Sequence, residues 1–333
     1  MLSKAFPLGL FFTLFVAGLA AGEKKAIPQD TFDRLKRYSV LCGITYQRNC
    51  PQPPEGITIK KKFNDNANGI IFEDDEANEL IVAFRGSSSI QDALTDADFF
   101  VQADYASPGV SGCDDCKIHA GFLKSWNTVA KDVISSVQGE LAENPKMKVV
   151  VTGHSLGGAL ASLAAMSMIG SDIKVDLVTF GQPRTGNQAY ADFVDKKAPD
   201  VMRVTHADDI VPQVPPKELA TFGYEHHSTE IWQEDEPEAA DTFQCEGQEP
   251  EDCNLSTRSV PDIKLIGNLS LAELASGTAS HGNYLGVPMG SFLADEKTCG
   301  GAPNLLRGLV RGAVSLIKPP KKVDVDSLKG NAL

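Results

Sequence analysis

The sequence predicts an α/β fold with a mostly parallel central sheet and helices on both of its faces. Strand-like segments alternate with helix-like segments along the middle of the chain. Some strand segments, such as Val149–Val151, are apolar without a break, which is typical of parallel strands buried on both sides. A third observation is a sharp junction at Ser155, where a β-branched run meets an Ala/Leu-rich run.

The predicted elements follow in chain order. Apolar side chains recur at helical spacing from Phe32 to Cys42, and again in a longer helix at 121–144 whose stripe includes Trp126 and Val133. The other predicted elements are strands at 69–74, 79–86, 148–153, 174–181 and 201–206 and helices at 156–168 and 187–197. No internal repeat or linker divides the middle of the chain, which favours one domain.

The two ends of the chain differ from the middle. Lys4 and the apolar run 6–22, which is short for a membrane span and ends in small residues, predict a signal peptide at 1–22. The main domain is then expected at 23–300. Residues 301–333 form a tail that we interpret as disordered or packed on the domain, the alternative being an amphipathic helix on anionic lipid.

Charge restricts the partners of the protein. The 333 residues carry a net charge of −13, which would repel a phosphate backbone and argues against nucleic-acid binding. The acidity is most simply a source of solubility. The strongly acidic stretch 233–252 is expected to be a solvated loop.

The chain has seven cysteines. If the protein is secreted, they are exposed to an oxidising compartment, where we expect them to form disulfides. The spacing of Cys113 and Cys116 favours a local disulfide over half a zinc site, since no second such pair exists to complete the site. Cys245 and Cys253 are a second candidate pair. Two sequons, at Asn254 and Asn268, also fit a secreted surface.

Ser155 is the candidate nucleophile. A tight strand-to-helix turn exposes a serine hydroxyl, and it requires small residues two positions before and after, which Gly153 and Gly157 supply. A helix beginning at Leu156 directs its free N–H groups towards the site. The N–H of Leu156 is therefore a predicted donor to the oxyanion of an attacked ester.

A serine nucleophile needs a histidine base and a carboxylate that orients it. His226, His227 and His281 follow Ser155 at sufficient distance, whereas His154 and His206 are more simply structural. Asp208 and Asp209 directly follow a predicted strand, where open α/β sheets place their sites. The chemistry alone leaves the choice open among the histidines and between the two aspartates.

Six ordered motifs carry a resemblance to a known family. They are IVAFRGS (81–87), IHAGF (118–122), VTGHSLGGALA (151–161), FGQPRTGN (180–187), DIVPQVPP (209–216) and SHGNYLG (280–286). Together they resemble the fungal extracellular class 3 triacylglycerol lipases of the α/β-hydrolase superfamily, a group that also includes feruloyl esterases. The similarity extends from about Tyr38 to Cys299.

The resemblance implies an α/β-hydrolase fold and particular site residues. Asp209 matches the family carboxylate and His281 the family base, while His226 matches a structural position. Ser87 matches the second oxyanion donor, beside Leu156. The resemblance also implies a disulfide between Cys42 and Cys299, which would leave Cys50 as the odd thiol.

The predicted function follows from these residues. We expect a secreted, monomeric serine hydrolase that cleaves acylglycerol esters through an acyl-enzyme on Ser155, without metal or cofactor. The alternatives are a feruloyl-type esterase acting on plant cell-wall esters and a non-catalytic lipid-binding relative. Ile90, Ala93 and Leu94 lie at i, i+3 and i+4 where related lipases carry a lid, so they predict a small apolar lid, the alternative being a fixed surface helix.

Overall fold

The computed structural model describes residues 24–47, 50, 53–87, 101–198, 200–217, 223–257 and 271–290, with only the backbone of 271–275. The predicted signal peptide (1–22), the predicted lid residues Ile90, Ala93 and Leu94, and the predicted tail (301–333) lie outside these residues. None of the described helices is long and apolar enough to cross a membrane.

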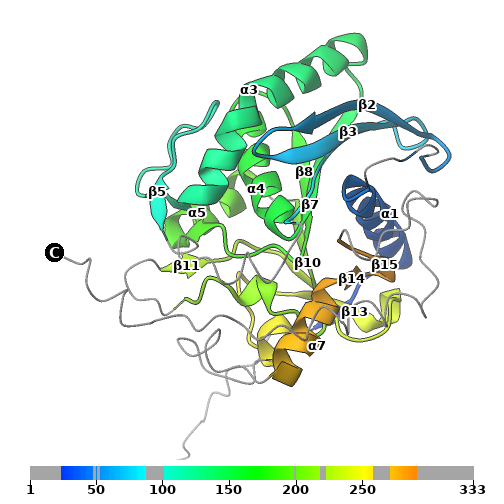
Figure 1. Ribbon diagram of the computed structural model, residues 1–333, viewed down its shortest axis with the longest axis vertical. Helices are drawn as coiled ribbons and strands as arrows, with labels where there is room; N and C mark the ends of the chain where they lie inside the picture. The colour runs from blue at the N-terminus through cyan, green and yellow to red at the C-terminus, as the bar shows by residue number, and fades with distance from the viewer. Residues whose placement is uncertain are drawn as a thin grey trace, which may run out of the picture.

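A nine-stranded mixed sheet forms the centre of the described residues (Figure 1). Its strands in spatial order are β1 (Lys25–Ala26), β13 (Thr242–Cys245), β12 (Glu230–Gln233), β10 (Val201–His206), β8 (Val175–Phe180), β7 (Lys148–His154), β4 (Glu79–Phe84), β3 (Asn68–Asp74) and β2 (Ile57–Asn64). The run from β12 to β4 is parallel. Both edges are antiparallel. The predicted mostly parallel α/β fold is confirmed.

The central strands are buried on both faces, as their unbroken apolar runs predicted. In β7, Val149 and Val151 face one hydrophobic core and Val150 faces the other. Val151 pairs with Val82 of β4 on one side and with Leu177 of β8 on the other. Because side chains alternate along a strand, a sheet with helices on both sides needs apolar residues at every position.

Helices cover both faces of the sheet (Figure 1). The predicted N-terminal helix is α1 (Gln29–Thr45), which packs on one face through Leu35 and Tyr38. The other face is covered by α3 (Ala120–Glu143), α4 (Leu156–Ile169) and α5 (Gln188–Lys197). The predicted apolar stripe of α3 is confirmed, since Trp126 and Val133 are buried in this second core.

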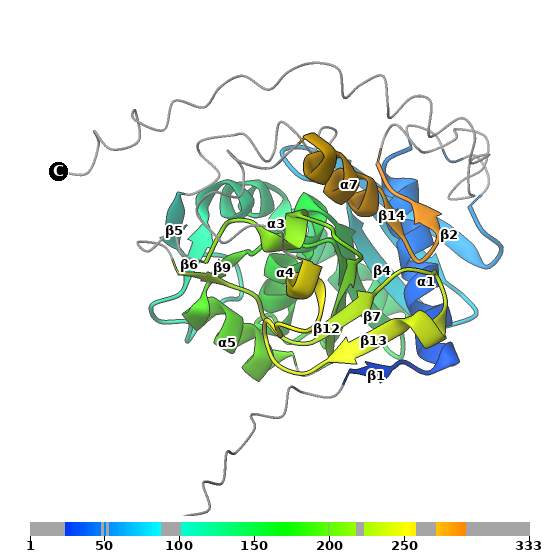
Figure 2. The same ribbon diagram turned by 90° about the horizontal axis from the view of Figure 1, so that it is seen from below.

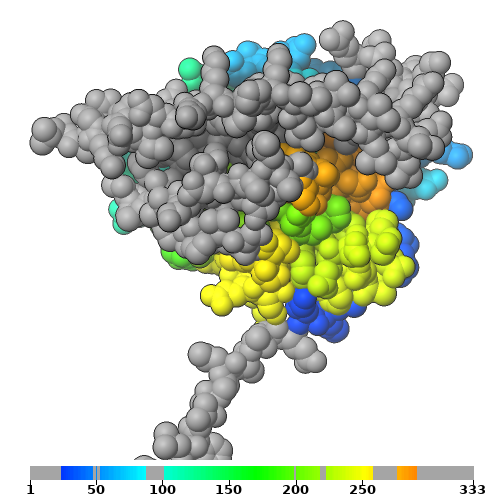
Figure 3. Space-filling model, turned by 60° about the horizontal axis from the view of Figure 1, so that its bottom comes forward, coloured from blue at the N-terminus to red at the C-terminus, as the bar shows by residue number. Residues whose placement is uncertain are grey.

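Short elements surround the sheet. A smaller sheet contains β5 (Gln102–Asp104), β6 (Lys117–His119), β9 (Gly186–Asn187) and β11 (Tyr224–Glu225). Three 3-10 turns, η2 (Val211–Gln213), η3 (Ala239–Asp241) and η4 (Asn254–Thr257), precede α7 (Leu271–His281) and the hairpin of β14 (Asn283–Tyr284) and β15 (Val287–Pro288). Figure 2 shows β1 beside β13 at the sheet edge. In Figure 3, residues 271–290 (orange) reach the surface beside the yellow segments.

The acidic stretch 233–252 is not simply a solvated loop, so this expectation was wrong. It contains the strand β13, and its Glu249 side chain is only 3% exposed. The Nε–H of Arg184, which is itself fully buried, donates to Glu249 Oε1 at 2.7 Å. A buried guanidinium needs a carboxylate partner, and that need draws this part of the acidic stretch inward.

The disulfides agree with the sequence in part. Cys113 is bonded to Cys116, and Cys245 to Cys253, as predicted. The assignment of the odd thiol was wrong, because Cys50 is disulfide-bonded and Cys42 is free. Cys42 lies on the buried stripe of α1, where its thiol contacts Thr152 Oγ1 of β7 at 3.4 Å. The disulfide between Cys42 and Cys299 that the family resemblance implied was therefore also wrong.

Candidate active site

The turn at Ser155 is a nucleophile elbow. Strand β7 ends at His154, helix α4 begins at Leu156, and Ser155 between them has φ 60° and ψ −132°. Positive φ is unfavourable for a residue with a Cβ, so the surrounding structure must hold the turn in place. A Cβ on Gly153 would lie 2.1 Å from the carbonyl oxygen of Gly157, which explains the glycines of the motif.

The elbow lies against the end of β4, where the second predicted oxyanion residue is found. A Cβ on Gly157 would lie 2.3 Å from Phe84 O, and one on Gly86 would lie 2.8 Å from the Cβ of Ser155. Ser87 directly follows Gly86. The two predicted oxyanion residues, Ser87 and Leu156, therefore stand on segments that meet at Ser155. As the first residue of α4, Leu156 has an N–H without an intrahelical partner.

His281 and Asp209 form a fully buried pair. His281 ends α7 and Asp209 lies in the loop between β10 and η2; both side chains are 0% exposed. His281 Nδ1 lies 2.7 Å from Asp209 Oδ2. A carboxylate only accepts hydrogen bonds, so Nδ1–H donates and Nε2 is the free nitrogen of the neutral ring. Among the described residues, that buried Nε2 has no hydrogen-bond partner.

Other contacts bring the His281 ring to the elbow. The N–H of Ser155 donates to Phe180 O at 2.9 Å, and a Cβ on the next residue, Gly181, would lie 2.8 Å from His281 Cε1. The ring of His154, directly before Ser155, lies 4.5 Å from the His281 ring between centroids. The candidate nucleophile and the histidine–aspartate pair thus share one small region at the carboxyl ends of β7, β8 and β10.

The two adjacent aspartates have separate roles in the structure. Asp208 accepts hydrogen bonds from the hydroxyls of Ser276 and Ser280 and so binds α7. Asp209 Oδ1 accepts the Val211 N–H at 2.8 Å, while Oδ2 also accepts the hydroxyl of Tyr284. Burial and the adjacent carboxylate raise the pKa of Tyr284, so its hydroxyl stays protonated and donates.

The remaining histidines are held by other groups. His206 Nδ1 donates to Ser280 O at 2.9 Å, and His226 Nε2 donates to Pro212 O at 2.7 Å. His227 Nε2 lies 3.1 Å from Gln182 Nε2, and burial lowers the pKa of His227 to about 4. Neither His226 nor His227 contacts Asp209 among the hydrogen bonds of the described residues.

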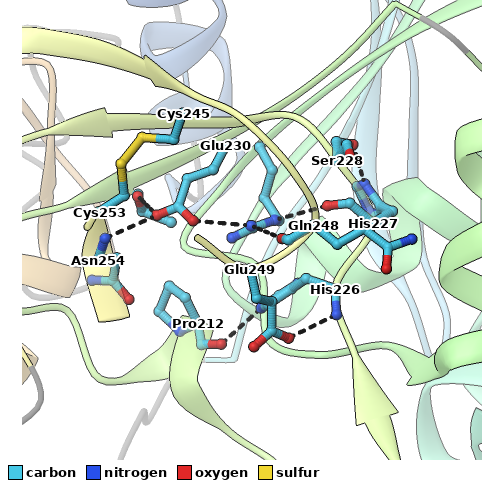
Figure 4. A network of polar contacts seen from close by, with 12 residues as sticks. Pro212, His226, His227, Ser228, Glu230, Cys245, Gln248, Glu249, Cys253 and Asn254 are labelled. Carbon is cyan, nitrogen blue, oxygen red and sulfur yellow. Dashed lines mark hydrogen bonds and ion pairs between the residues drawn. A yellow bond between two sulfur atoms is a disulfide. The ribbon is translucent and has the colours of Figure 1, made fainter. Parts of the chain in front are cut away.

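A buried polar network that includes Glu230 and Asn254 (Figure 4) supports the loop that carries Asp209. Arg203 donates to Glu230 Oε2 at 3.2 Å, and the other carboxylate oxygen of Glu230 accepts from Thr205 Oγ1 and the Asn254 N–H. The side-chain amide of Asn254 donates to the carbonyls of Ala207, at 3.0 Å, and Asp209, at 3.1 Å. The disulfide at Cys253 adjoins this residue.

Asn254 corrects an expectation from the sequence. Its sequon suggested a surface position, but the residue is 3% exposed and its amide nitrogen is already used by two carbonyls. Sequence reasoning also missed Tyr284 as a site residue, although its hydroxyl binds Asp209. Tyr284 stood inside the last resemblance motif, which was the available signal.

The described residues contain no group of three or more His, Cys, Asp or Glu side chains placed to hold a metal ion. The sheet and the elbow together define a protein of the α/β-hydrolase fold. The crystal structure of a lipase from Rhizopus microsporus var. chinensis is similar, with 33% identity, a TM-score of 0.69, and coverage of 82% of this chain and 93% of that one. Lipase II from Rhizopus niveus has 29% identity, a TM-score of 0.68, and coverage of 81% and 99%.

The family model described as "Lipase (class 3)" matches residues 81–219. This chain belongs to the class 3 lipase family. A secreted mono- and diacylglycerol lipase of Fusarium solani is 36% identical over 202 residues, which are 58% of this chain and 56% of the relative. A lipase of Rhizopus niveus is 34% identical over 232 residues, 68% and 56% respectively. The chain thus spans a little more than half the length of these curated relatives.

Proposed function

We propose that the protein is a secreted serine hydrolase that cleaves the carboxylic esters of acylglycerols through an acyl-enzyme on Ser155. The observation that carries the proposal is that a strained serine lies beside a buried His281–Asp209 pair. Within the described part of the chain, His281 Nε2 has no hydrogen-bond partner. A serine hydroxyl becomes a strong nucleophile when such a nitrogen takes its proton.

The reaction has two acyl-transfer steps. His281 Nε2 takes the Ser155 proton as the oxygen attacks the ester carbonyl, and then gives that proton to the leaving alcohol. Water, deprotonated by the same nitrogen, then attacks the acyl-enzyme. The fatty acid leaves as His281 Nε2 returns that proton to Ser155 Oγ. Asp209 keeps the imidazole in the tautomer with Nδ1 protonated and stabilises its charged form.

The oxyanion of each tetrahedral intermediate is assigned to donors from Leu156 and Ser87. The N–H of Leu156 opens a helix, where the dipole also favours negative charge. Ser87 would add its backbone N–H and its hydroxyl. Losing one such donor typically costs about 3 kcal/mol of transition-state stabilisation.

The relatives favour acylglycerols as substrates. Those described above are named lipases or mono- and diacylglycerol lipases, which supports glycerides over the feruloyl esters that the sequence left as the alternative. Secretion is supported by the predicted signal peptide, by the word "secreted" in the name of the Fusarium relative, and by two disulfides, which persist in oxidising compartments. We expect the enzyme to act as a monomer at a lipid–water interface.

One comparison of rates tests the function. The full chain, expressed with its own leader, is assayed on emulsified triacylglycerol, emulsified diacylglycerol and soluble methyl ferulate, with Ser155→Ala beside each. We expect glyceride turnover that falls by about 10⁶-fold in the mutant. The ratio of the two glyceride rates identifies the preferred class. Turnover of methyl ferulate with inert emulsions would overturn the proposal.

A further inference from the structure

We propose that Tyr46 and His154 are positioning residues that connect the oxyanion loop, the nucleophile and the base through one buried hydrogen-bond chain. The proposal rests on the function proposed above, because it assigns a task within that reaction. Tyr46 directly follows the last residue of α1, and His154 ends β7. The two residues are 6% and 2% exposed.

Three contacts build the chain. The N–H of Gly86 donates to the Tyr46 hydroxyl at 3.0 Å. That hydroxyl lies 2.7 Å from His154 Nδ1. At the other side of the ring, His154 Nε2 lies 2.9 Å from the backbone carbonyl oxygen of His281.

The chemistry of these groups gives every bond a direction. A carbonyl only accepts, so His154 Nε2–H donates to His281 O. Burial, and then the neighbouring His281, lower the pKa of His154 well below its ordinary value, so the ring is neutral and carries one proton. Nδ1 is therefore an acceptor, and the Tyr46 hydroxyl donates to it while accepting from Gly86. Donation runs one way, from Gly86 through Tyr46 and His154 to His281.

Three residues of this hydrogen-bond chain adjoin or belong to the proposed catalytic groups. Gly86 precedes Ser87, His154 precedes Ser155, and the acceptor carbonyl belongs to His281 itself. The His154 ring also lies 4.5 Å from the His281 ring. The chain can therefore set the spacing of donor, nucleophile and base, which come from three separate elements.

Gly86 packs closely against Tyr46, His154 and Ser155. A Cβ on Gly86 would lie 2.3 Å from the Tyr46 hydroxyl, 2.6 Å from His154 O and 2.8 Å from Ser155 Cβ. The loop, the tyrosine and the elbow are in van der Waals contact here. A shift of the tyrosine would consequently move the oxyanion loop relative to Ser155, and small misplacements of reacting groups cost rate.

Tyr46→Phe is the central test, because it removes the hydroxyl and keeps the ring. We expect kcat on a soluble short-chain ester to fall about tenfold, with KM unchanged. Tyr105→Phe is the matched control. The buried hydroxyl of Tyr105 donates to the carbonyl of Leu163, a residue of α4, at 3.2 Å, and it takes no part in the hydrogen bonds described above. Both variants lose one buried hydroxyl, so a general loss of stability would affect both melting temperatures.

Two substitutions of His154 test separately the hydrogen bonds that its ring makes to Tyr46 and to His281. Glutamine can still donate from its amide to the carbonyl of His281, whereas asparagine can still accept from Tyr46 near the Nδ1 position. We expect each to restore part of the kcat that His154→Ala loses. In a Tyr46→Phe background the advantage of asparagine should disappear, because the donor that it serves is gone.

The outcomes distinguish this proposal from the proposed function. An inactive wild-type protein would refute the function itself. With an active wild type and inactive Ser155→Ala, an unchanged kcat in Tyr46→Phe would overturn the positioning role, as would an equal fall in Tyr46→Phe and Tyr105→Phe. A fall in kcat confined to Tyr46→Phe, with asparagine and glutamine each giving partial rescue, would establish it.

Discussion

Asp208 and Asp209 are adjacent in the sequence, yet their carboxylates bind different parts of the molecule. Asp209 accepts from His281 Nδ1 at 2.7 Å, while Asp208 accepts from two serine hydroxyls of α7. The peptide between them turns one carboxylate into the site and the other along the helix that carries His281. The same substitution, aspartate to asparagine, can therefore be compared at two adjacent positions of one loop.

Asp209→Asn should lower kcat by about 10⁴-fold, because an amide no longer favours the tautomer with Nδ1 protonated. Asp208→Asn should keep most of the activity, since Asp208 reaches His281 only through the packing of α7. Steady-state kinetics on a soluble ester measure both effects. Comparable losses in the two variants would contradict the separate roles.

Gly153→Ala should prevent formation of the elbow, because its Cβ would lie 2.1 Å from a backbone oxygen that cannot move aside. The expected result is a large fall in the melting temperature together with loss of activity. Gly139→Ala is the control, as this glycine lies inside α3 with nothing within 4 Å of the added carbon. That change should stabilise the protein by up to about 1 kcal/mol. Equal melting temperatures for the two variants would contradict the elbow geometry.

Asn254 should carry no glycan in the active protein, despite its sequon. Its amide nitrogen is buried and donates to the carbonyls of Ala207 and Asp209. Peptide mapping by mass spectrometry, with enzymatic deglycosylation in heavy-oxygen water, measures the occupancy directly. Ser256→Ala destroys the sequon and keeps the amide, so it should retain activity, whereas Asn254→Ala should lose about 1 kcal/mol or more of stability. A fully glycosylated, active protein would refute the buried position.

Glu249 should stabilise the fold in a pH-dependent manner. Burial alone would raise the pKa of Glu249, but the charge and hydrogen bonds of Arg184 outweigh burial and lower it. A carboxyl with a depressed folded pKa contributes stability above its unfolded value, and that stability is lost as pH falls towards the folded pKa. Glu249→Gln should cost about 3 kcal/mol at neutral pH. Melting temperatures from pH 7 downwards should show the difference from wild type shrinking below about pH 4.5.

Cys42 should be unreactive in the native protein. Burial raises the pKa of its thiol to about 12, and the thiolate is the reactive form. Alkylation followed by peptide mapping should label Cys42 only after denaturation. Labelling of Cys50 in the native, unreduced protein would contradict its disulfide. Cys42→Ala should leave the alkylation pattern of the other cysteines unchanged.

The central elements were predictable because each is encoded by a local pattern. The stripe of α3 repeats over many turns, and the apolar run of β7 reflects burial on both faces. The first two strands at one end of the sheet, β1 and β13, were missed for an equally physical reason. Strand β1 has only two residues, Lys25 and Ala26, and β13 lies within an acidic stretch, so neither shows the alternation that identifies a strand.

By itself, the sequence determined the class of fold, the serine at a strand-to-helix turn and, through family motifs, the residues to examine around it. These features depend on neighbours in the chain, whose spacing the sequence displays directly. Only the tertiary structure decided that Cys42 is free and that Asn254 and Glu249 are buried. It also supplies the contact between Asp209 and His281, a pair that the family motifs had implied. Such choices depend on where a side chain points after distant segments pack, and a buried charge or amide must then find its partner across the fold.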